Sequence, residues 1–318
     1  MERHRAGHSN ETFFVRRGGH RWVLRRPPRG AFLPTAHDVM REHRVLSALA
    51  DTPVRAPRPA LACPDGSVIG APFYVMEHVE GDVPRSTFPT HLDTEAERRR
   101  MGEDVVDALA ELHAVDWRAV GLDGWGRPTG YLDRQLRRWG GQLEMASRFT
   151  RPLPELMAAG EWLAARVPDS PPSTIVHGDY KLDNMVLAPR APARVAAILD
   201  WEMSTVGDPL ADLGYLLWFW REPGDPSEAL LAEQLELTRA PGFPTRGELV
   251  ERYRDRTGRE VGDMTWYVVL AIWKLAILLE SSYARHLAGV TDDRFFEQLE
   301  AGVPALARRA LDVAAQGV

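Results

Sequence analysis

The sequence predicts an α+β fold with two lobes: a small β-rich lobe over residues 1–80 and a larger helical lobe over residues 81–318. Short β-rich runs dominate the first part of the chain, whereas apolar residues recur at helical spacing over most of the second part. The chain has 318 residues, of which 44% are hydrophobic, so it is long enough to bury the cores of two lobes.

The first lobe is predicted from short strands and one helix. Residues 11–16 and 20–25 are rich in β-forming side chains, and the Gly-Gly pair at 18–19 between them indicates a hairpin. Asp38 is suited to capping a helix whose apolar residues follow at helical spacing. After a proline-rich segment that ends this helix, residues 72–79 are typical of a buried strand.

The second lobe is predicted to be mainly helical with a small β insertion. Helical patterns cover residues 95–115, 131–149, 153–167 and the chain from 210 onward. Short strands are expected between them, over residues 174–176, 184–187 and 194–199. The most apolar run, residues 266–279, contains Lys274 and falls short of the about 20 residues of a membrane span, so we expect a buried helix.

Composition and charge narrow the class of protein. The single cysteine, Cys63, cannot form an internal disulfide, which favours a cytoplasmic protein. The first 80 residues hold 12 Arg against 8 acidic residues, a net charge of +4 that suits an anionic nucleotide, whereas the whole chain carries −6. The sequence lacks a concentrated basic run with interleaved aromatics and a secretory signal, so neither a nucleic acid nor a membrane is expected as a partner.

One segment combines polar side chains at the ends of predicted strands. It runs Ile-Val-His-Gly-Asp-Tyr-Lys-Leu-Asp-Asn over residues 175–184, and a second strand ends in Asp-Trp-Glu at 200–202. Phosphoryl transfer needs one group that orients the attacking hydroxyl, oxygen ligands for Mg²⁺ and a cation at the transferred phosphate. Both segments together supply these groups at strand ends, where they can converge.

This pattern resembles the aminoglycoside phosphotransferase family of the protein-kinase-like fold, whose catalytic loop reads HGDxxxxN. The resemblance implies ATP as donor and Asp179 as the catalytic base, with Lys181 as the cation near the γ-phosphate. It also implies that Asn184 and Asp200 bind Mg²⁺. His177 is interpreted differently, as a residue whose ring holds the loop through hydrogen bonds to backbone.

A second segment extends the resemblance with structural residues. In Gly-Asp-Pro-Leu-Ala-Asp-Leu-Gly over 207–214, Asp208 is predicted to cap the following helix and Asp212 to reach back to the catalytic-loop backbone. The composition adds a hint, because the chain has two lysines, Lys181 and Lys274, against 37 arginines. A lysine kept in the catalytic loop of such a chain suggests a need for a compact charge.

The nucleotide side of the resemblance lies in the first lobe. Ser9 falls in the short glycine-containing turn that covers the phosphates in the family, and backbone groups of Glu77 and Val79 would hydrogen-bond adenine. Arg25 occupies the place of the usual ATP lysine, with Glu42 as its expected partner. Arg26 is a rival for this role, but strand alternation places it on the opposite face of the strand.

The acceptor is predicted from resemblance within the family. The runs VLRRPP and HGDYKLDN and the late Ser-Ser-Tyr-Ala-Arg at 281–285 look most similar to the kinase domains associated with acyl-CoA dehydrogenases, which implies a hydroxyacyl acceptor and a link to acyl-CoA metabolism. Tyr283 and Arg285 are candidate acceptor-binding residues. An aminoglycoside kinase and a choline- or homoserine-type amino-alcohol kinase remain alternatives. A nucleotide-binding regulatory protein without turnover is the alternative from another class, and the sequence does not predict the oligomeric state.

Overall fold

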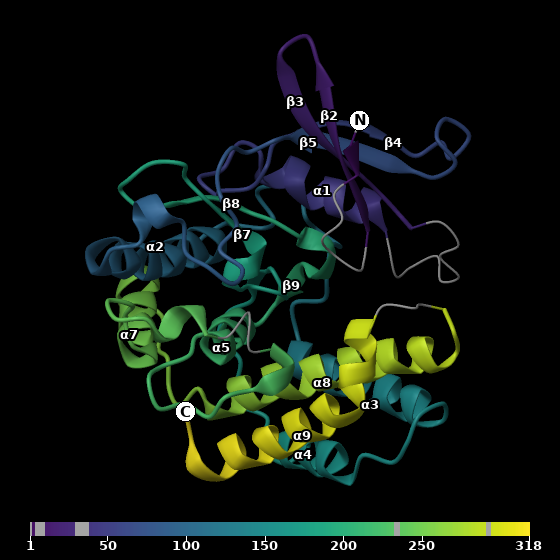
Figure 1. The fold of residues 1–318 in the computed structure, drawn as a ribbon, viewed down its shortest axis with the longest axis vertical. Helices are drawn as coiled ribbons and strands as arrows, with labels where there is room; N and C mark the ends of the chain where they lie inside the picture. Colours follow the sequence, from purple (N-terminus) through teal and green to yellow (C-terminus); the bar gives the residue numbers. More distant parts are fainter. Residues whose placement is uncertain (1, 4–9, 29–37, 232–235, 291–293) are drawn as a thin grey trace.

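The computed structural model describes residues 2–3, 10–28, 38–231, 236–290 and 294–318. A small lobe of antiparallel sheet and one helix sits over a larger helical lobe, as the sequence predicts (Figure 1). The strands are β1 (Glu2–Arg3), β2 (Glu11–Arg17), β3 (His20–Arg26), β4 (Pro59–Cys63), β5 (Phe73–Glu77), β6 (Thr174–Val176), β7 (Met185–Leu187), β8 (Val195–Ile198) and β9 (Thr205–Gly207). The helices are α1 (Val39–Leu49), α2 (Glu95–His113), α3 (Tyr131–Ser147), α4 (Pro154–Ala164), α5 (Leu210–Phe219), α7 (Arg246–Thr257), α8 (Thr265–Leu287) and α9 (Leu299–Gln316).

The small lobe is built on a five-stranded antiparallel sheet with the order β1-β2-β3-β5-β4. The predicted β2–β3 hairpin is confirmed: Gly18 and Gly19 form its two-residue turn with φ values of +56° and +83°, which glycine adopts without strain. Asp38 caps α1 by accepting a hydrogen bond from the amide of Arg41 at 3.0 Å, also as predicted. The buried face of α1 packs against β4 and β5.

The sequence did not predict three of the strands. β4 begins at Pro59 inside the proline-rich segment, and it forms an edge of the sheet, where a missing amide donor is tolerated. β9 pairs with β6 although it has only three residues, and β1 pairs with β2 over two residues. The chain after residue 210 is also less continuous than expected, because short 3₁₀ turns at Ala229–Leu231 and Leu237–Arg239 separate α5 from α7.

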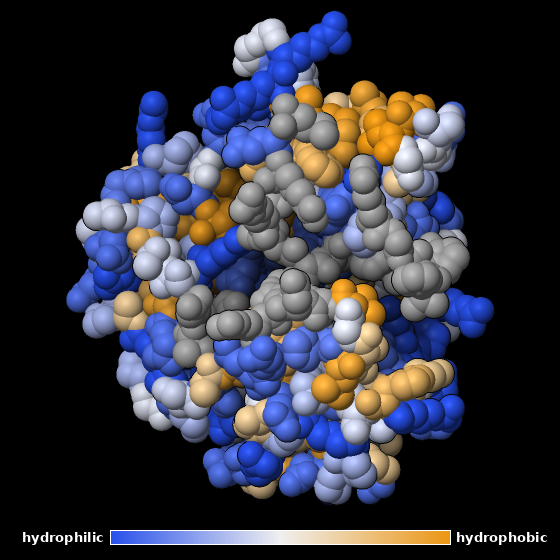
Figure 2. Space-filling view, turned by 45° about the vertical axis from the view of Figure 1, so that its right-hand side comes forward, coloured by the Kyte–Doolittle hydropathy of each residue, from blue (hydrophilic) through white to orange (hydrophobic). Residues whose placement is uncertain are grey.

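The core of the large lobe forms around α8, which packs against α3, α4, α5 and α9. By length and composition α8 could cross a membrane, but 67% of its most apolar 18-residue window is buried inside the protein. The prediction of a buried helix at 266–279 is therefore confirmed. Figure 2 shows that the face it draws is largely hydrophilic, with hydrophobic colour gathered over the small lobe, where Leu61, Val68 and Ile69 are exposed.

Backbone contacts beside the cleft join the segment after β5 to β7 and the small lobe to β8. Asp82 and Leu187 form an isolated β-bridge with N···O distances of 3.1 and 2.8 Å, and the amide of Ile198 donates to the carbonyl of Arg55 at 2.7 Å. Gly81 must be glycine, because an added Cβ would lie 1.9 Å from the carbonyl oxygen of Leu187. These contacts fix how the strand ends of the large lobe lie under the sheet of the small lobe.

Candidate active site

The loop from His177 to Asn184 connects β6 to β7 and is held by a buried carboxylate. The amides of His177 and Gly178 donate to the two carboxylate oxygens of Asp212 at 2.6 and 2.7 Å. Gly178 has φ +85°, and a Cβ there would lie 2.7 Å from the carbonyl oxygen of Met203. The predicted contact between Asp212 and the loop backbone is confirmed, and it fixes the position of the residue that follows, Asp179.

His177 holds the loop in the way the sequence predicts. One nitrogen of its ring lies 2.8 Å from the carbonyl oxygen of Leu199, and the other accepts from the amide of Asp179 at 3.2 Å. The ring also packs edge-on against Trp201 at 4.9 Å between centroids. The buried imidazole thus ties the loop to the end of β8, which brings Asp179 and Asp200 to the same cleft.

Asp179 lies among hydrogen-bond donors and cations. The side-chain amide of Asn184 donates to its carboxylate at 2.7 Å, and Nζ of Lys181 lies 3.7 Å from the other carboxylate oxygen. Burial raises the pKa of Asp179, but Lys181, Lys274 and a hydrogen bond from Tyr215 outweigh burial and leave the pKa below its usual range. Asp179 is therefore a carboxylate at neutral pH, able to accept a hydrogen bond from a hydroxyl.

Lys274 is a site residue that the sequence analysis did not assign. It lies in the buried part of α8, and its ammonium group donates to the carbonyl oxygen of Gly178. Burial lowers the pKa of Lys274 to about 8 against the opposing effect of Asp179. The scarcity of lysine was the available signal, because both lysines of this arginine-rich chain lie beside Asp179.

We expect Lys274→Met to stabilise the fold by about 2 kcal/mol at pH 7. Methionine has a shape similar to that of lysine and removes a charge whose burial costs more than its attraction to Asp179 returns. The pKa of the lysine falls from 10.5 to about 8 on folding, so the unfolded chain binds more protons between these values. The stability of the wild type should therefore rise with pH across that window, and the advantage of the variant should shrink. Thermal unfolding at pH 7 and pH 10 measures this difference; a variant less stable than wild type at pH 7 would contradict the expectation.

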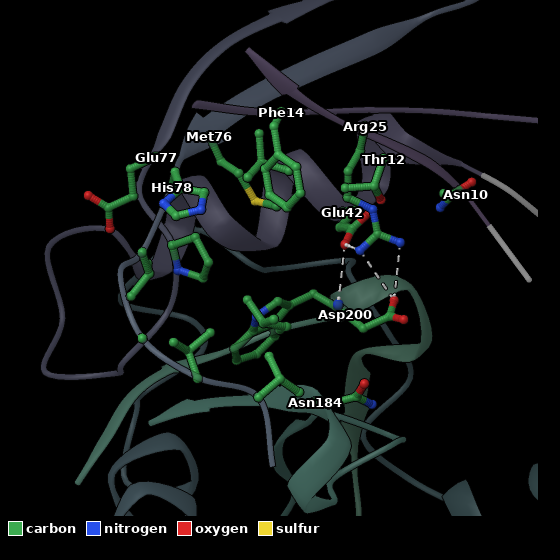
Figure 3. Close-up of a pocket in the computed structure, with 18 of the residues that line it drawn as sticks. Asn10, Thr12, Phe14, Arg25, Glu42, Met76, Glu77, His78, Asn184 and Asp200 are labelled. Atoms are coloured by element: carbon green, nitrogen blue, oxygen red, sulfur yellow. Dashed lines mark hydrogen bonds and ion pairs between the residues drawn. The ribbon is translucent and has the colours of Figure 1, made fainter. Parts of the chain in front are cut away.

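Asp200 occupies a strained position on the other side of the loop. Among the residues that the structure describes, it is the non-glycine residue with positive φ, at +64°. One of its carboxylate oxygens lies 3.3 Å from the guanidinium of Arg25, which also donates to Glu42 at 2.7 Å (Figure 3). The amide of Trp201 donates to Glu42 at 3.3 Å. The predicted Arg25–Glu42 pair thus forms, and it extends across the cleft to Asp200.

The charges of this cluster depend on each other because Arg25 and Glu42 are buried and Asp200, which is partly exposed, lies beside them. Burial raises the pKa of Glu42 to about 6, partly offset by Arg25. Burial alone would lower the pKa of Arg25, but Glu42 and Asp200 outweigh it, so the guanidinium stays charged. Arg26 is excluded from the cleft: it pairs with Glu11 at 2.7 Å and donates to the carbonyl oxygen of Ile69.

A cavity of about 490 Å³ lies between the sheet and this cluster. Its roof carries Phe14, Val23 and Met76, and the segment after β5 closes one end (Figure 3). The cavity is lined by Asn10, Arg25, Glu42, Glu77, Val79, Asn184 and Asp200, among others. Apolar walls and a charged end are the features expected where a base and its phosphates bind. Ser9 lies outside the described residues.

Asn184 and Asp200 are suited to hold Mg²⁺ together. Because the amide nitrogen of Asn184 donates to Asp179, its amide oxygen is the atom left for a cation. In the described part of the chain, no group of three or more His, Cys, Asp or Glu side chains gathers at one point. Mg²⁺ bound with a nucleotide commonly takes one or two protein oxygens and completes its shell with phosphates and water, so the pair fits.

The two acceptor-binding candidates lie elsewhere on α8. Tyr283 is nine residues beyond Lys274, about 13 Å along the helix, and its ring packs under Arg151 at 4.9 Å. The guanidinium of Arg285 donates a hydrogen bond to the hydroxyl of Ser282 at 3.0 Å. Neither residue lines the 490 Å³ cavity or a second cavity, of about 580 Å³, whose wall includes Gly178 of the catalytic loop. Their role stays a prediction.

Comparison with known proteins gives a consistent result for sequence and structure. A model of the phosphotransferase enzyme family, APH, matches residues 1–249. Acyl-CoA dehydrogenase family member 11 of Rattus norvegicus is 37% identical over 292 residues, and an Arabidopsis thaliana protein described as a probable acyl-CoA dehydrogenase, IBR3, is 34% identical over 299. These matches cover 91% and 89% of the chain but 37% and 36% of the relatives, so the chain spans little more than a third of their length.

Solved structures of phosphotransferases share the fold. A Ralstonia eutropha protein provisionally assigned as an aminoglycoside phosphotransferase has a TM-score of 0.83 and 31% identity, covering 100% of this chain and 92% of its own. Aminoglycoside 2'-phosphotransferase-IIIa in its GDP complex has a TM-score of 0.62 and 15% identity, covering 97% and 92%. Macrolide 2'-phosphotransferase MphH from Brachybacterium faecium has 0.60 and 18%, covering 95% and 91%. The protein-kinase-like fold predicted from the sequence is confirmed.

Proposed function

Because the chain belongs to the APH phosphotransferase enzyme family, we propose that it is a small-molecule kinase that transfers the γ-phosphoryl group of ATP to an alcohol. The observation that carries this proposal is the placement of Asp179. Its ionised carboxylate is fixed by Asn184, with two lysines beside it, and the loop that bears it also lines the cleft with the apolar cavity. A group held in this way can orient an attacking hydroxyl.

In this proposal, Asp179 acts on the acceptor, and the other side chains of the site act on the nucleotide. Asp179 accepts a hydrogen bond from the acceptor hydroxyl and takes its proton as the new P–O bond forms and the bond to the leaving ADP breaks. Lys181, 3.7 Å from Asp179, is proposed to offset the charge of the transferred phosphoryl group. Arg25, which pairs with Glu42, is proposed to bind the α- and β-phosphates. Mg²⁺, held by Asn184 and Asp200 when bound, would neutralise charge on the phosphates.

The nucleotide is proposed to bind in the cavity under the sheet. Backbone groups of Glu77 and Val79 are proposed to bind adenine, with Met76 against the ring, because these residues line the apolar end of the cavity. The related aminoglycoside 2'-phosphotransferase-IIIa was solved with GDP, so GTP is a competing donor that the test must include. The proposed nucleotide is ATP.

The proposed acceptor is a hydroxyacyl-CoA-like molecule, and the proposed compartment is the cytoplasm. Support for this acceptor comes from the acyl-CoA dehydrogenase names of the relatives, which concern proteins much longer than this chain. The alternatives are an aminoglycoside and an amino alcohol such as choline or homoserine. The residues near Asp179 disfavour an aminoglycoside and choline, because cationic acceptors would lie close to Lys181, Lys274 and several arginines. Homoserine also carries a carboxylate, so the acceptor panel is needed to decide against it.

The test is an acceptor panel with ATP or GTP and Mg²⁺, followed through release of the nucleoside diphosphate and by mass spectrometry of the acceptor. We expect hydroxyacyl-CoAs to gain one phosphoryl group and to raise ADP release above the rate without acceptor. Phosphorylation of an aminoglycoside or amino alcohol instead would replace the proposed acceptor. Nucleotide binding without transfer to any alcohol would favour the regulatory alternative.

A further inference from the structure

A second cavity, of about 580 Å³, lies beside the catalytic loop on the side of α3 and α8. Gly178, the residue before Asp179, and Lys274 form part of its wall. The rest comes from α3, from the segment before it, from Arg41 on α1 and from residues 202–205. Asn184 and Asp200 line the other cavity, so the loop separates a nucleotide side from this second side. A molecule in the second cavity would lie against Gly178, one residue before Asp179.

The wall of this cavity is strongly cationic. Five arginines line it together with Lys274, and Glu202 is the carboxylate among the described lining residues; the arginines are Arg41, Arg127, Arg134, Arg137 and Arg138. The protein as a whole is acidic, with a net charge of −6, so this concentration of positive charge is local. Like charges gathered in one concave site repel each other, and an anion bound there would relieve that repulsion.

The arginines fall into two groups. Arg41 and Arg134 have structural contacts: Arg41 donates to the carbonyl of Ser204 at 3.0 Å and stacks on Trp125, and Arg134 donates to the carbonyls of Thr129 and Arg127. Arg127, Arg137 and Arg138 are exposed, and within the described part of the chain they form no ion pair with a carboxylate. Arg138 also lies over the ring of Trp139, 5.0 Å from its centroid, and that contact uses none of its N–H donors. The guanidinium donors of all three arginines are therefore available to a ligand.

The positive charge of these arginines lowers the pKa of neighbouring cationic groups. Burial lowers the pKa of Arg134, and the neighbouring Arg127 and Arg137 lower it further. Burial is the main cause of the lowered pKa of Lys274, and Arg138 lowers that pKa further. Lys274 contacts the loop of Asp179. The charge of the arginine cluster therefore acts on Lys274, which contacts the loop that carries Asp179.

We propose that this cavity binds the acceptor through phosphate groups on it, held by Arg127, Arg137 and Arg138, while its hydroxyl lies at Asp179. Arginine suits such a ligand because its planar fork bonds phosphate oxygens in pairs. Three arginines that form no ion pair within the described residues match a ligand group with two or more negative charges better than a ligand with one carboxylate. The proposal rests on the proposed function for the hydroxyl and adds the chemical class of the remainder of the acceptor.

The test measures binding, so that it does not depend on turnover. Calorimetry would titrate coenzyme A, phosphate-free pantetheine and inorganic pyrophosphate into full-length protein whose nucleotide site is filled with a non-hydrolysable ATP analogue and Mg²⁺. We expect coenzyme A to bind and pantetheine to bind at least about tenfold more weakly. Arg137→Gln with Arg138→Gln should weaken binding of coenzyme A about tenfold or more.

The matched control is Arg148→Gln with Arg166→Gln. These two arginines are also exposed, lie at the ends of α3 and α4 outside the cavity lining, and carry the same total charge. The control should change affinity by no more than about twofold. Equal losses in both double variants, equal binding of pantetheine and coenzyme A, or no binding of coenzyme A and pyrophosphate would each overturn the proposal. Binding as expected without transfer to any alcohol would contradict the proposed function and leave the anion site in place.

Discussion

Replacing Asp179 by asparagine is expected to lower the rate of phosphoryl transfer about a thousandfold while nucleotide binding is kept. Asparagine preserves the shape of the side chain, and the lysines that surround it remain. The variant loses the negative oxygen that would accept the hydroxyl proton, because an amide is a poor acceptor for a proton. The rate is measured as acceptor-dependent ADP release, and nucleotide affinity by calorimetry.

The control for this variant is Asp255→Asn, which removes a carboxylate from an exposed position on α7. It should leave both transfer and nucleotide affinity within about twofold of wild type, as expected for a surface substitution. A rate for Asp179→Asn within about tenfold of wild type would show that another group receives the proton. Loss of nucleotide binding would instead indicate that the loop had not kept its conformation.

Replacing Asp200 by asparagine is expected to reduce transfer by about a hundredfold or more and to raise the Mg²⁺ concentration needed for half-maximal activity. The choice of asparagine is decisive here, because Asp200 has φ +64° and asparagine tolerates this left-handed conformation well. The backbone of the β8 end should therefore stay in place. The change in activity then reports the loss of charge at the cation site.

The measurement is a Mg²⁺ titration of activity for wild type, Asp200→Asn and the control Glu236→Gln, whose side chain is exposed and far along the chain from the site. The control should follow the wild-type curve. An unchanged Mg²⁺ requirement in Asp200→Asn would contradict the role of this carboxylate. A variant that unfolds at lower temperature would be recognised by a thermal melt, which separates a folding defect from a loss of metal.

Local features of the fold could be predicted because short sequence patterns determine them. The Gly-Gly turn at 18–19 and the cap at Asp38 act on backbone within a few residues. The contact of Asp212 with the loop backbone, 34 and 35 residues earlier, was predicted because both segments resemble the family pattern. β4 was missed because Pro59 argues against a strand, and it is the edge position in the folded sheet that makes proline acceptable. That position is a property of tertiary structure.

The residues of the catalytic loop and of the β8 end were easier to predict than the lining of the second cavity for the same reason. The loop residues lie within eight positions of one another, and Asp200 follows on the next strand. The arginines of the second cavity come from three separate segments, and their positions show no motif until α1, α3 and the segment before α3 are placed together. Lys274 is nearly a hundred residues from Asp179, and burial in α8 decides its environment.

The contact between Arg25 and Asp200 also bears on how the cleft opens. It joins a strand of the small lobe to the end of β8 in the large lobe, and Glu42 holds the same guanidinium from α1. Moving one lobe away from the other would break this ion pair, so the pair would oppose opening of the cleft in the absence of ligand. Phosphates and a divalent cation would offer each partner a new counter-charge, and the protein would then be free to flex as its ligands arrive.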